Sequence, residues 1–124
     1  MAKVLLVDDD VDFVELTQTL LESNGYDVIT AHNGADGKAA AAAEKPNVIV
    51  LDVMMTTKTE GFHTARELRA DDATKAIPII MLTAVNQEVP WKFGPDEVWL
   101  PVDEFLEKPV KPEVLLNSIQ KALS

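Results

Sequence analysis

The stretches VLLVDDD (residues 4–10) and VIVLD (residues 48–52) decide the fold, because each is a short apolar run that ends in carboxylates. A third run, Ile77–Leu82, has the same character, with Pro78 at the start of the strand. Continuous apolar runs of this length are typical of strands buried on both faces, as in a parallel sheet. Two weaker strand candidates are Tyr26–Ala31 and Glu104–Glu107.

Segments with helical character separate these runs, and they span Val11–Asn24, Ala35–Glu44, Gly61–Ala70 and Pro112–Leu123. The apolar face expected for the first of them consists of Phe13, Leu16, Leu20 and Leu21. Gly25 then stands where a helix-ending residue belongs. Pro112 suits the first turn of the last helix.

Strands that alternate with helices imply a parallel sheet covered by helices on both faces. We therefore predict one α/β domain over residues 1–124, a doubly wound five-stranded parallel sheet of the flavodoxin-like type with strand order 2-1-3-4-5. Residues 86–101 contain Pro90, Pro95, Pro101 and Gly94. A fourth helix in that region is expected to be short or irregular.

The composition narrows the range of functions. The 124 residues carry a formal net charge of −10, 47% of them are hydrophobic, and none is a cysteine. Such acidity argues against a nucleic-acid-binding surface and favours cations and partners with basic patches. The missing cysteines exclude disulfides and thiolate metal sites. No signal peptide is recognisable and no apolar run approaches the roughly 20 residues of a membrane span, so we expect no membrane insertion and a cytoplasmic location.

Candidate functional residues follow the apolar runs. In an open parallel sheet, ligands bind beyond the carboxyl ends of the strands. The polar side chains that follow the first, third, fourth and fifth strands are Asp8, Asp9 and Asp10, then Asp52, then Thr83, then Lys108. With the strand order 2-1-3-4-5 these ends are neighbours, so carboxylates, a hydroxyl and an ammonium converge on one shallow pocket.

The chemistry of this set points to phosphoryl transfer. Clustered carboxylates repel one another, and a hard divalent cation such as Mg²⁺, which prefers oxygen ligands, relieves the repulsion. Asp52 is then a candidate nucleophile toward phosphorus, while the metal and Lys108 neutralise charge on the transferred group. Thr83 can hydrogen-bond to a phosphoryl oxygen. Asp10 stands directly before the first helix and is interpreted as its N-cap.

In four motifs the sequence resembles the response-regulator receiver family, and the resemblance covers essentially the whole chain. The motifs occur in order, as VLLVDDD (4–10), VIVLDVMM (48–55), IIMLTA (79–84) and FLEKP (105–109). The resemblance implies a two-component signalling protein that accepts a phosphoryl group on Asp52 from a histidine kinase or phosphotransfer protein. It also implies a separate output protein, because no output domain follows the last helix, and catalysis limited to the chain's own phosphorylation and dephosphorylation.

The metal ligands also follow from the resemblance. Asp9 and Asp52 would bind Mg²⁺ directly, joined by the backbone carbonyl of Met54. Asp8 would act through a metal-bound water. The family usually has proline four residues after the acceptor, where this chain has Thr56, and the loop that follows is one residue longer. We therefore expect a more mobile loop beside the site.

The resemblance further implies a switch. Thr83 would move toward the phosphoryl group, and Phe105 would swing inward to fill the vacated space. Lys108 would contact the phosphoryl group, and the Lys108–Pro109 peptide bond would be cis, a minority form that a fold must hold in place. The span from Thr83 to Lys108 is a few residues longer than usual, in the region that builds the output face of the family.

Two other classes of function stay open. A small phosphohydrolase of the haloacid-dehalogenase type carries Asp-x-Asp-x-Thr/Val after its first strand, and residues 10–14 (DVDFV) match this pattern formally. Asp10 would then be the nucleophile, although the pattern lies where the first helix should begin. A pseudo-receiver would keep the fold and bind partners constitutively, so that replacing Asp52 would leave binding unchanged. The complete acidic set, with Thr83 and Lys108, opposes this second hypothesis.

Overall fold

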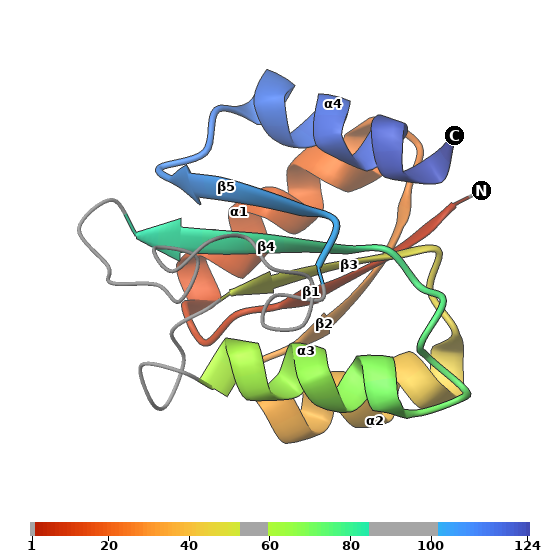
Figure 1. The fold of residues 1–124 in the computed structure, drawn as a ribbon. Coiled ribbons are helices and arrows are strands. Elements are labelled where there is room, and N and C mark those ends of the chain that lie inside the picture. The colour runs from red at the N-terminus through yellow and green to blue at the C-terminus, as the bar shows by residue number, and fades with distance from the viewer. Residues whose placement is uncertain (1, 53–59, 85–101) are drawn as a thin grey trace.

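Five parallel strands form one sheet with the order β2-β1-β3-β4-β5, and helices cover both of its faces (Figure 1). The computed structural model describes residues 2–52, 60–84 and 102–124. The elements, in chain order, are β1 (Lys3–Val7), α1 (Val11–Ser23), β2 (Asp27–Ala31), α2 (Gly34–Glu44), β3 (Val48–Asp52), α3 (Glu60–Ala70), β4 (Ile79–Ala84), β5 (Glu104–Lys108) and α4 (Pro112–Leu123). The predicted fold class and strand order are confirmed.

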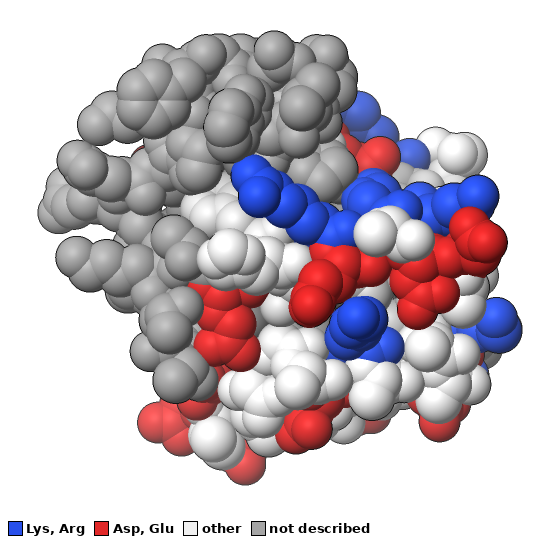
Figure 2. Space-filling model, turned by 60° about the horizontal axis from the view of Figure 1, so that its bottom comes forward, with Lys and Arg blue, Asp and Glu red and all other residues white. Residues whose placement is uncertain are grey.

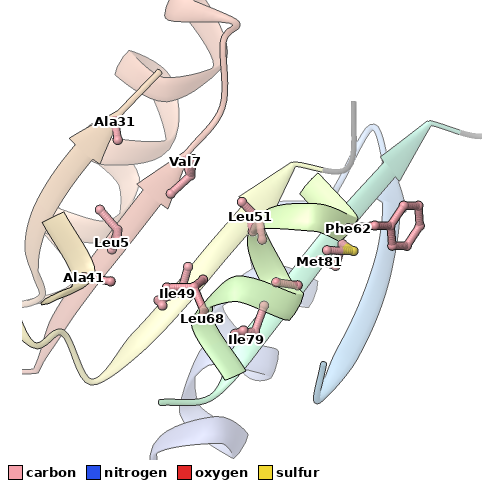
Figure 3. Close-up of a cluster of buried hydrophobic side chains, with 11 residues drawn as sticks. Leu5, Val7, Ala31, Ala41, Ile49, Leu51, Phe62, Leu68, Ile79 and Met81 are labelled. Carbon is pink, nitrogen blue, oxygen red and sulfur yellow. The ribbon is translucent and has the colours of Figure 1, made fainter. Parts of the chain in front are cut away.

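Among the described residues, α1 and α4 cover one face of the sheet, and α2 and α3 cover the other (Figure 1). Successive residues of a strand point to opposite faces, so the buried side chains form two clusters. The α2–α3 cluster consists of Leu5, Val7, Ala31, Ala41, Ile49, Leu51, Phe62, Ala65, Leu68, Ile79 and Met81 (Figure 3). The α1–α4 cluster consists of Val4, Leu6, Val14, Leu21, Val48, Val50, Ile80, Leu82, Leu115 and Ile119.

The strand β4 is shifted by two residues relative to the prediction. Pairing begins at Ile79 because the Ile77 N–H donates to the carbonyl of Thr74 in a turn, at 3.0 Å, and Pro78 has no N–H to donate. The carbonyl of Pro78 still accepts a hydrogen bond from Ile49, at 2.9 Å. The bounds of the other elements agree with the predictions to within one residue.

The buried face of α1 also differs from the prediction. Val14, Thr17 and Leu21 are the buried residues of this helix, and their spacing is that of a helical stripe. Leu16, which the sequence assigned to the apolar face, is 74% exposed, so that assignment was wrong. It lies two residues after Val14, about 200° around the helix, and therefore points away from the sheet.

The helix labelled α4 is the C-terminal one, and its observed bounds equal the predicted bounds. Lys111 is its N-cap, and Pro112 occupies its first turn, where a missing N–H does no harm. The expected short or irregular fourth helix falls within residues 86–101, which lie outside the described residues. Among the helices of the described ranges, none has both the length and the apolar character needed to cross a bilayer.

The outer face formed by α2 and α3 carries charges of both signs. Figure 2 shows Lys and Arg side chains interleaved with Asp and Glu across this face. Lys38 and Glu67 link α2 with α3 at 4.0 Å, and Arg69 bonds to Asp103 at 2.8 Å. Asp103 also accepts the N–H of Ile79, at 2.7 Å. Exposed pairs contribute about 0–1 kcal/mol each, so packing of the two helices matters more.

Helices α2 and α3 meet at Gly34, the first residue of α2. The Gly34 N–H donates a hydrogen bond to the carboxylate of Glu60, the first residue of α3. A Cβ atom built on Gly34 would overlap Oγ1 of Thr64 and would lie 3.0 Å from Oε2 of Glu60. The missing side chain at position 34 therefore allows α2 to begin directly against α3.

Replacing Gly34 with alanine should lower the free energy of unfolding by about 1–3 kcal/mol through overpacking. This is the opposite of the usual gain of about 1 kcal/mol for alanine over glycine in a helix. Gly34→Ala should lower the free energy of unfolding by less when it is made in a Thr64→Ala background, because Thr64→Ala removes the overlapping oxygen. Urea unfolding of the two single variants, the double variant and the wild type measures this difference. Equal stability of Gly34→Ala and wild type would contradict the close contact.

Candidate functional site

The sheet register brings the carboxyl ends of four strands to one edge. Val7 at the end of β1 pairs with Leu51 in β3, and Ala84 at the end of β4 pairs with Lys108 at the end of β5. In Figure 1 this edge lies on the left, where the arrowheads of β4 and β5 point. Polar residues that follow β1, β3, β4 and β5 in the sequence are therefore neighbours in space.

Three carboxylates form the centre of this edge. Asp8 and Asp9 follow β1, and Asp52 ends β3; each offers a carboxylate oxygen, and these oxygens all lie within 4.8 Å of one another. Asp8 is 2% exposed and Asp52 is 6% exposed, whereas Asp9 is open to solvent. The sequence predicted this cluster from the positions of the strand ends, and the structure brings all three residues together.

Asp8 is held from several directions. Its N–H donates to the carbonyl of Ala31 at 3.1 Å, which extends the pairing of β1 with β2 by one residue. Its Oδ1 accepts the N–H of Asp10 at 2.9 Å, and its Oδ2 accepts a hydrogen bond from Nζ of Lys108 at 2.7 Å. Nδ1 of His32 lies 3.2 Å from the Asp8 carbonyl oxygen. The carboxylate thus has a fixed orientation, and both of its oxygens have donors.

Lys108 supplies a positive charge to the cluster. Its Nζ lies 2.7 Å from Oδ2 of Asp8 and 3.6 Å from Oδ1 of Asp52, and 24% of its side chain is exposed. Burial acts to lower the pKa of Lys108, but the hydrogen bond to Asp8 and the charges of Asp52, Asp8 and Asp10 outweigh it and raise that pKa. The side chain is therefore an ammonium at neutral pH.

The ionisation of Asp52 is disfavoured in the folded chain. Burial, followed by the negative charge of Asp8, raises the pKa of Asp52 from 3.8 to about 7. A hydrogen bond with Asp8 and the charge of Asp9 act in the same direction, and Lys108 opposes them. Burial and like charges both penalise an anion. The single positive charge of Lys108 therefore does not neutralise the negative charge of the three carboxylates, and a further cation would help to do so.

The donor set fits a hard divalent cation. Such ions take oxygen ligands, and carboxylates are their usual protein ligands. Asp8, Asp9 and Asp52 supply three carboxylates against the one ammonium of Lys108, so the fully ionised cluster lacks positive charge. The carbonyl of Met54, a further expected ligand, lies outside the described residues.

Asp10 belongs to the helix and not to the acidic cluster. It is the N-cap of α1, and its Oδ1 accepts the N–H of Phe13 at 3.1 Å. The interpretation of Asp10 as a cap is thus confirmed. Asp12 lies in the first turn of the same helix. The pattern DVDFV is therefore the start of a helix, and the geometry gives no support to Asp10 as a nucleophile.

Two expected switch residues lie on the other face of the sheet. Thr83 is buried in β4 and alternates onto the same face as Met81, and Phe105 packs against the α2–α3 cluster. By the same alternation, Asp8, Asp52 and Lys108 face the α1–α4 side of the sheet. The peptide bond between Lys108 and Pro109 is cis, which is the geometry that the resemblance implies.

Comparison with known proteins decides the family. The sequence model of the response regulator receiver domain matches residues 4–120. This chain belongs to that family. The receiver is 38% identical over 127 residues to the protein PilH of Pseudomonas aeruginosa, and the alignment covers 100% of the chain and 99% of PilH. It is 41% identical over 121 residues to PhoP of Bacillus subtilis, an alkaline phosphatase synthesis transcriptional regulatory protein.

Solved structures agree with this assignment. The chemotaxis protein CheY4 of Vibrio cholerae matches the receiver with a TM-score of 0.86 and 34% identity, and 99% of each chain is covered. A putative response regulator from Chloroflexus aurantiacus matches with a TM-score of 0.85 and 27% identity, over 98% of this chain and 97% of that one. The receiver spans nearly all of PilH but only 48% of PhoP. The transcriptional role in the name of PhoP is stated for that longer protein alone.

Phe13 is a residue of the site that the sequence assigned only to packing. Its ring lies beneath the ammonium of Lys108, with 4.5 Å between Nζ and the ring centroid. The sequence does place Phe13 one turn after the acids of the first motif. Its partner Lys108 is distant in the chain, however, and no spacing rule connects a helix residue with the end of the last strand.

The raised pKa of Asp52 should make the metal-free receiver less stable at higher pH. The folded chain keeps a proton on Asp52 up to about pH 7, whereas the unfolded chain releases it near pH 3.8. The stability that Asp52 contributes is therefore fully present below pH 3.8, the pKa in the unfolded chain. It is lost as the pH rises through about 7, the pKa in the folded chain. In EDTA at about pH 8, Asp52→Asn should raise the free energy of unfolding by about 1–3 kcal/mol.

Denaturant unfolding at about pH 5 and about pH 8 measures this effect, which should be much smaller at the lower pH. Asp72→Asn is the matched control, because the Asp72 side chain is 93% exposed. An equal increase in the free energy of unfolding in both variants would assign the effect to net charge. No increase in Asp52→Asn at about pH 8 would contradict the unfavourable ionisation of Asp52.

Proposed function

We propose that this receiver works as a phosphorylation switch in which Asp52 accepts the phosphoryl group. The buried acidic cluster beside Lys108 carries the proposal. It combines a carboxyl group that becomes a nucleophile when a cation favours its ionisation with neighbours that can bind a divalent cation and neutralise phosphoryl oxygens. Membership of the receiver family supports the same function.

Asp52 is the nucleophile in the proposed reaction. One of its carboxylate oxygens forms a bond to the phosphorus of a phosphohistidine, while the bond from phosphorus to the imidazole nitrogen breaks and that nitrogen keeps the electron pair. Catalysis of such a transfer depends on positioning and on neutralising the three outer oxygens. The Lys108 ammonium, 3.6 Å from Asp52, is placed to do this.

We assign Mg²⁺ to the acidic cluster. In this assignment Asp9, Asp52 and the backbone carbonyl of Met54 would hold the ion directly, and Asp8 would act on it through a water. The hydrogen bonds of Asp8 favour its less direct role, because one oxygen accepts a backbone N–H and the other accepts Lys108. When bound, the cation supplies positive charge to the carboxylates and to the incoming phosphoryl group.

The readout of phosphorylation is assigned to the opposite face of the sheet. In the proposed switch the Thr83 hydroxyl moves to bond a phosphoryl oxygen, and Phe105 moves inward. Both residues lie on the α2–α3 face, and Phe105 is only partly buried there. The altered surface then binds a separate output protein, and the phosphoryl donor is a histidine kinase or histidine phosphotransfer protein. The receiver catalyses only its own phosphorylation and dephosphorylation.

Intact mass measurement tests the identity of the acceptor. After incubation with Mg²⁺ and acetyl phosphate, the wild-type chain should gain one phosphoryl group. Asp52→Asn should gain none, since it lacks the nucleophilic carboxylate, and EDTA should abolish the gain in the wild type. Asp72→Asn, which removes an exposed acid far from the cluster, should behave as the wild type.

Other outcomes would support the competing functions. Repeated hydrolysis of the donor without an adduct, abolished by Asp10→Asn, would support a phosphohydrolase. A chain that gains no phosphoryl group from acetyl phosphate or from a phosphorylated phosphotransfer protein would be a pseudo-receiver, provided that Asp52→Asn leaves its partner binding unchanged.

Mg²⁺ should also stabilise the fold. A tenfold excess of Mg²⁺ over its dissociation constant adds about 1.4 kcal/mol to the free energy of unfolding, which raises the Tm of a chain this size by about 5 °C. Asp9→Asn should remove most of this shift, because it removes a proposed ligand. Asp12→Asn, which changes an acid of α1 outside the cluster, should keep it. Equal shifts in both variants would point to non-specific charge screening.

A further inference from the structure

Phe13 lies in the first turn of α1, beside the acidic cluster. Its N–H donates to the capping carboxylate of Asp10 at 3.1 Å, and its side chain packs against the α1–α4 cluster. The ring is therefore held from two directions, by the cap of the helix and by packing on the sheet.

The ring of Phe13 forms one wall around the ammonium of Lys108. Nζ lies 4.5 Å from the ring centroid, 2.7 Å from Oδ2 of Asp8 and 3.6 Å from Oδ1 of Asp52. The face of an aromatic ring attracts a cation through its quadrupole. The ring also keeps water from that side of the ammonium. Groups from α1, the end of β1 and the end of β3 thus define the position of one charge.

We propose that Phe13 is a positioning residue for phosphoryl transfer, and that its ring holds the Lys108 ammonium in place at the site. The inference rests on the proposed function, in which Lys108 neutralises the transferred group. A lysine carries its charge on a flexible four-carbon stem. Electrostatic stabilisation is effective when the charge is in place before the reaction. A contact that fixes the end of the stem therefore raises the rate.

This contact matters most when a cation occupies the acidic cluster. Asp8 and Asp52 hold Lys108 through their negative charges, and the same carboxylates are proposed to face Mg²⁺. Neutralising them weakens their attraction for the ammonium. The ring of Phe13 has no atom that binds Mg²⁺, so its hold on Lys108 persists after the metal binds.

A role in packing alone has different consequences. Phe13 also lines a groove of about 330 Å³ between α1 and α4, together with Leu16, Thr17, Leu20, Val110, Pro112 and Leu115. If Phe13 only filled space there, leucine would be an adequate replacement. The effect of the replacement would also be the same whether or not residue 108 is a lysine.

NMR of the metal-free receiver tests the contact independently of activity. Protons above an aromatic ring are shifted upfield, so the Hε resonances of Lys108 should be shifted in the wild type. Phe13→Trp and Phe13→Tyr keep a ring face and should keep the shift, whereas Phe13→Leu should lose it. Thermal unfolding checks that each variant is folded, and Phe13→Met serves as a second apolar replacement if the leucine variant is unfolded.

Phosphorylation rates then test the positioning role in a double-mutant cycle. The rate of Asp52 phosphorylation by acetyl phosphate at saturating Mg²⁺ should fall about fivefold in Phe13→Leu, the size expected for losing one cation–π contact. The dissociation constant of Mg²⁺, measured by calorimetry, should not rise. Phe13→Tyr should stay within about twofold of the wild type. In a Lys108→Met background, Phe13→Leu should have no further effect.

Two results would overturn the positioning role alone: equal rates for the wild type and Phe13→Leu, or the same fivefold loss in the Lys108→Met background. Absence of any adduct on the wild type would overturn the proposed function, and the positioning role with it. These failures are distinguishable, because only the last of them removes the Asp52-dependent mass gain from the wild-type chain.

Discussion

Charge balance at one edge of the sheet is the constraint on which the rest of this structure depends. Asp8, Asp9 and Asp52 offer oxygens within 4.8 Å of one another, and the ammonium of Lys108 contacts two of these residues. Burial and repulsion both oppose the ionisation of Asp52, so the folded chain holds a carboxyl group whose ionisation at neutral pH a bound cation would favour. The two hydrophobic clusters supply the stability that offsets this arrangement.

The alternation of side chains along the strands divides the site between the two faces of the sheet. Asp8, Asp52 and Lys108 face the α1–α4 side, where Phe13 of α1 contacts the ammonium. Thr83 and Phe105 belong to the α2–α3 face. Chemistry on one face and the proposed readout on the other are then joined through β4 and β5, in which Thr83 pairs with Glu107 and the next residue, Ala84, pairs with Lys108. A change at the phosphoryl group can therefore affect the second face through these two adjacent strands.

The sequence predicted most of the fold and the acidic cluster, because a parallel sheet places every carboxyl end on one edge regardless of its loops. Apolar runs located the strands, and the residues after them located Asp8, Asp52 and Lys108. The surroundings of Leu16 and Phe13 could not be predicted in this way, since they depend on which side of α1 packs against the sheet and on the position of Lys108, which is distant in the chain. The start of β4 depends on a single turn hydrogen bond between Ile77 and Thr74. The expectations for Met54 and for residues 86–101 fall outside the described residues.

The most direct test of this account is the titration of Asp52 itself, followed by ¹³C NMR of its carboxyl carbon with EDTA and with Mg²⁺. We expect an apparent pKa of about 7 in EDTA and a clear fall when Mg²⁺ is added, because the cation neutralises the cluster that disfavours the anion. A titration of Asp52 near its ordinary value of 3.8 in EDTA, unchanged by Mg²⁺, would contradict the account.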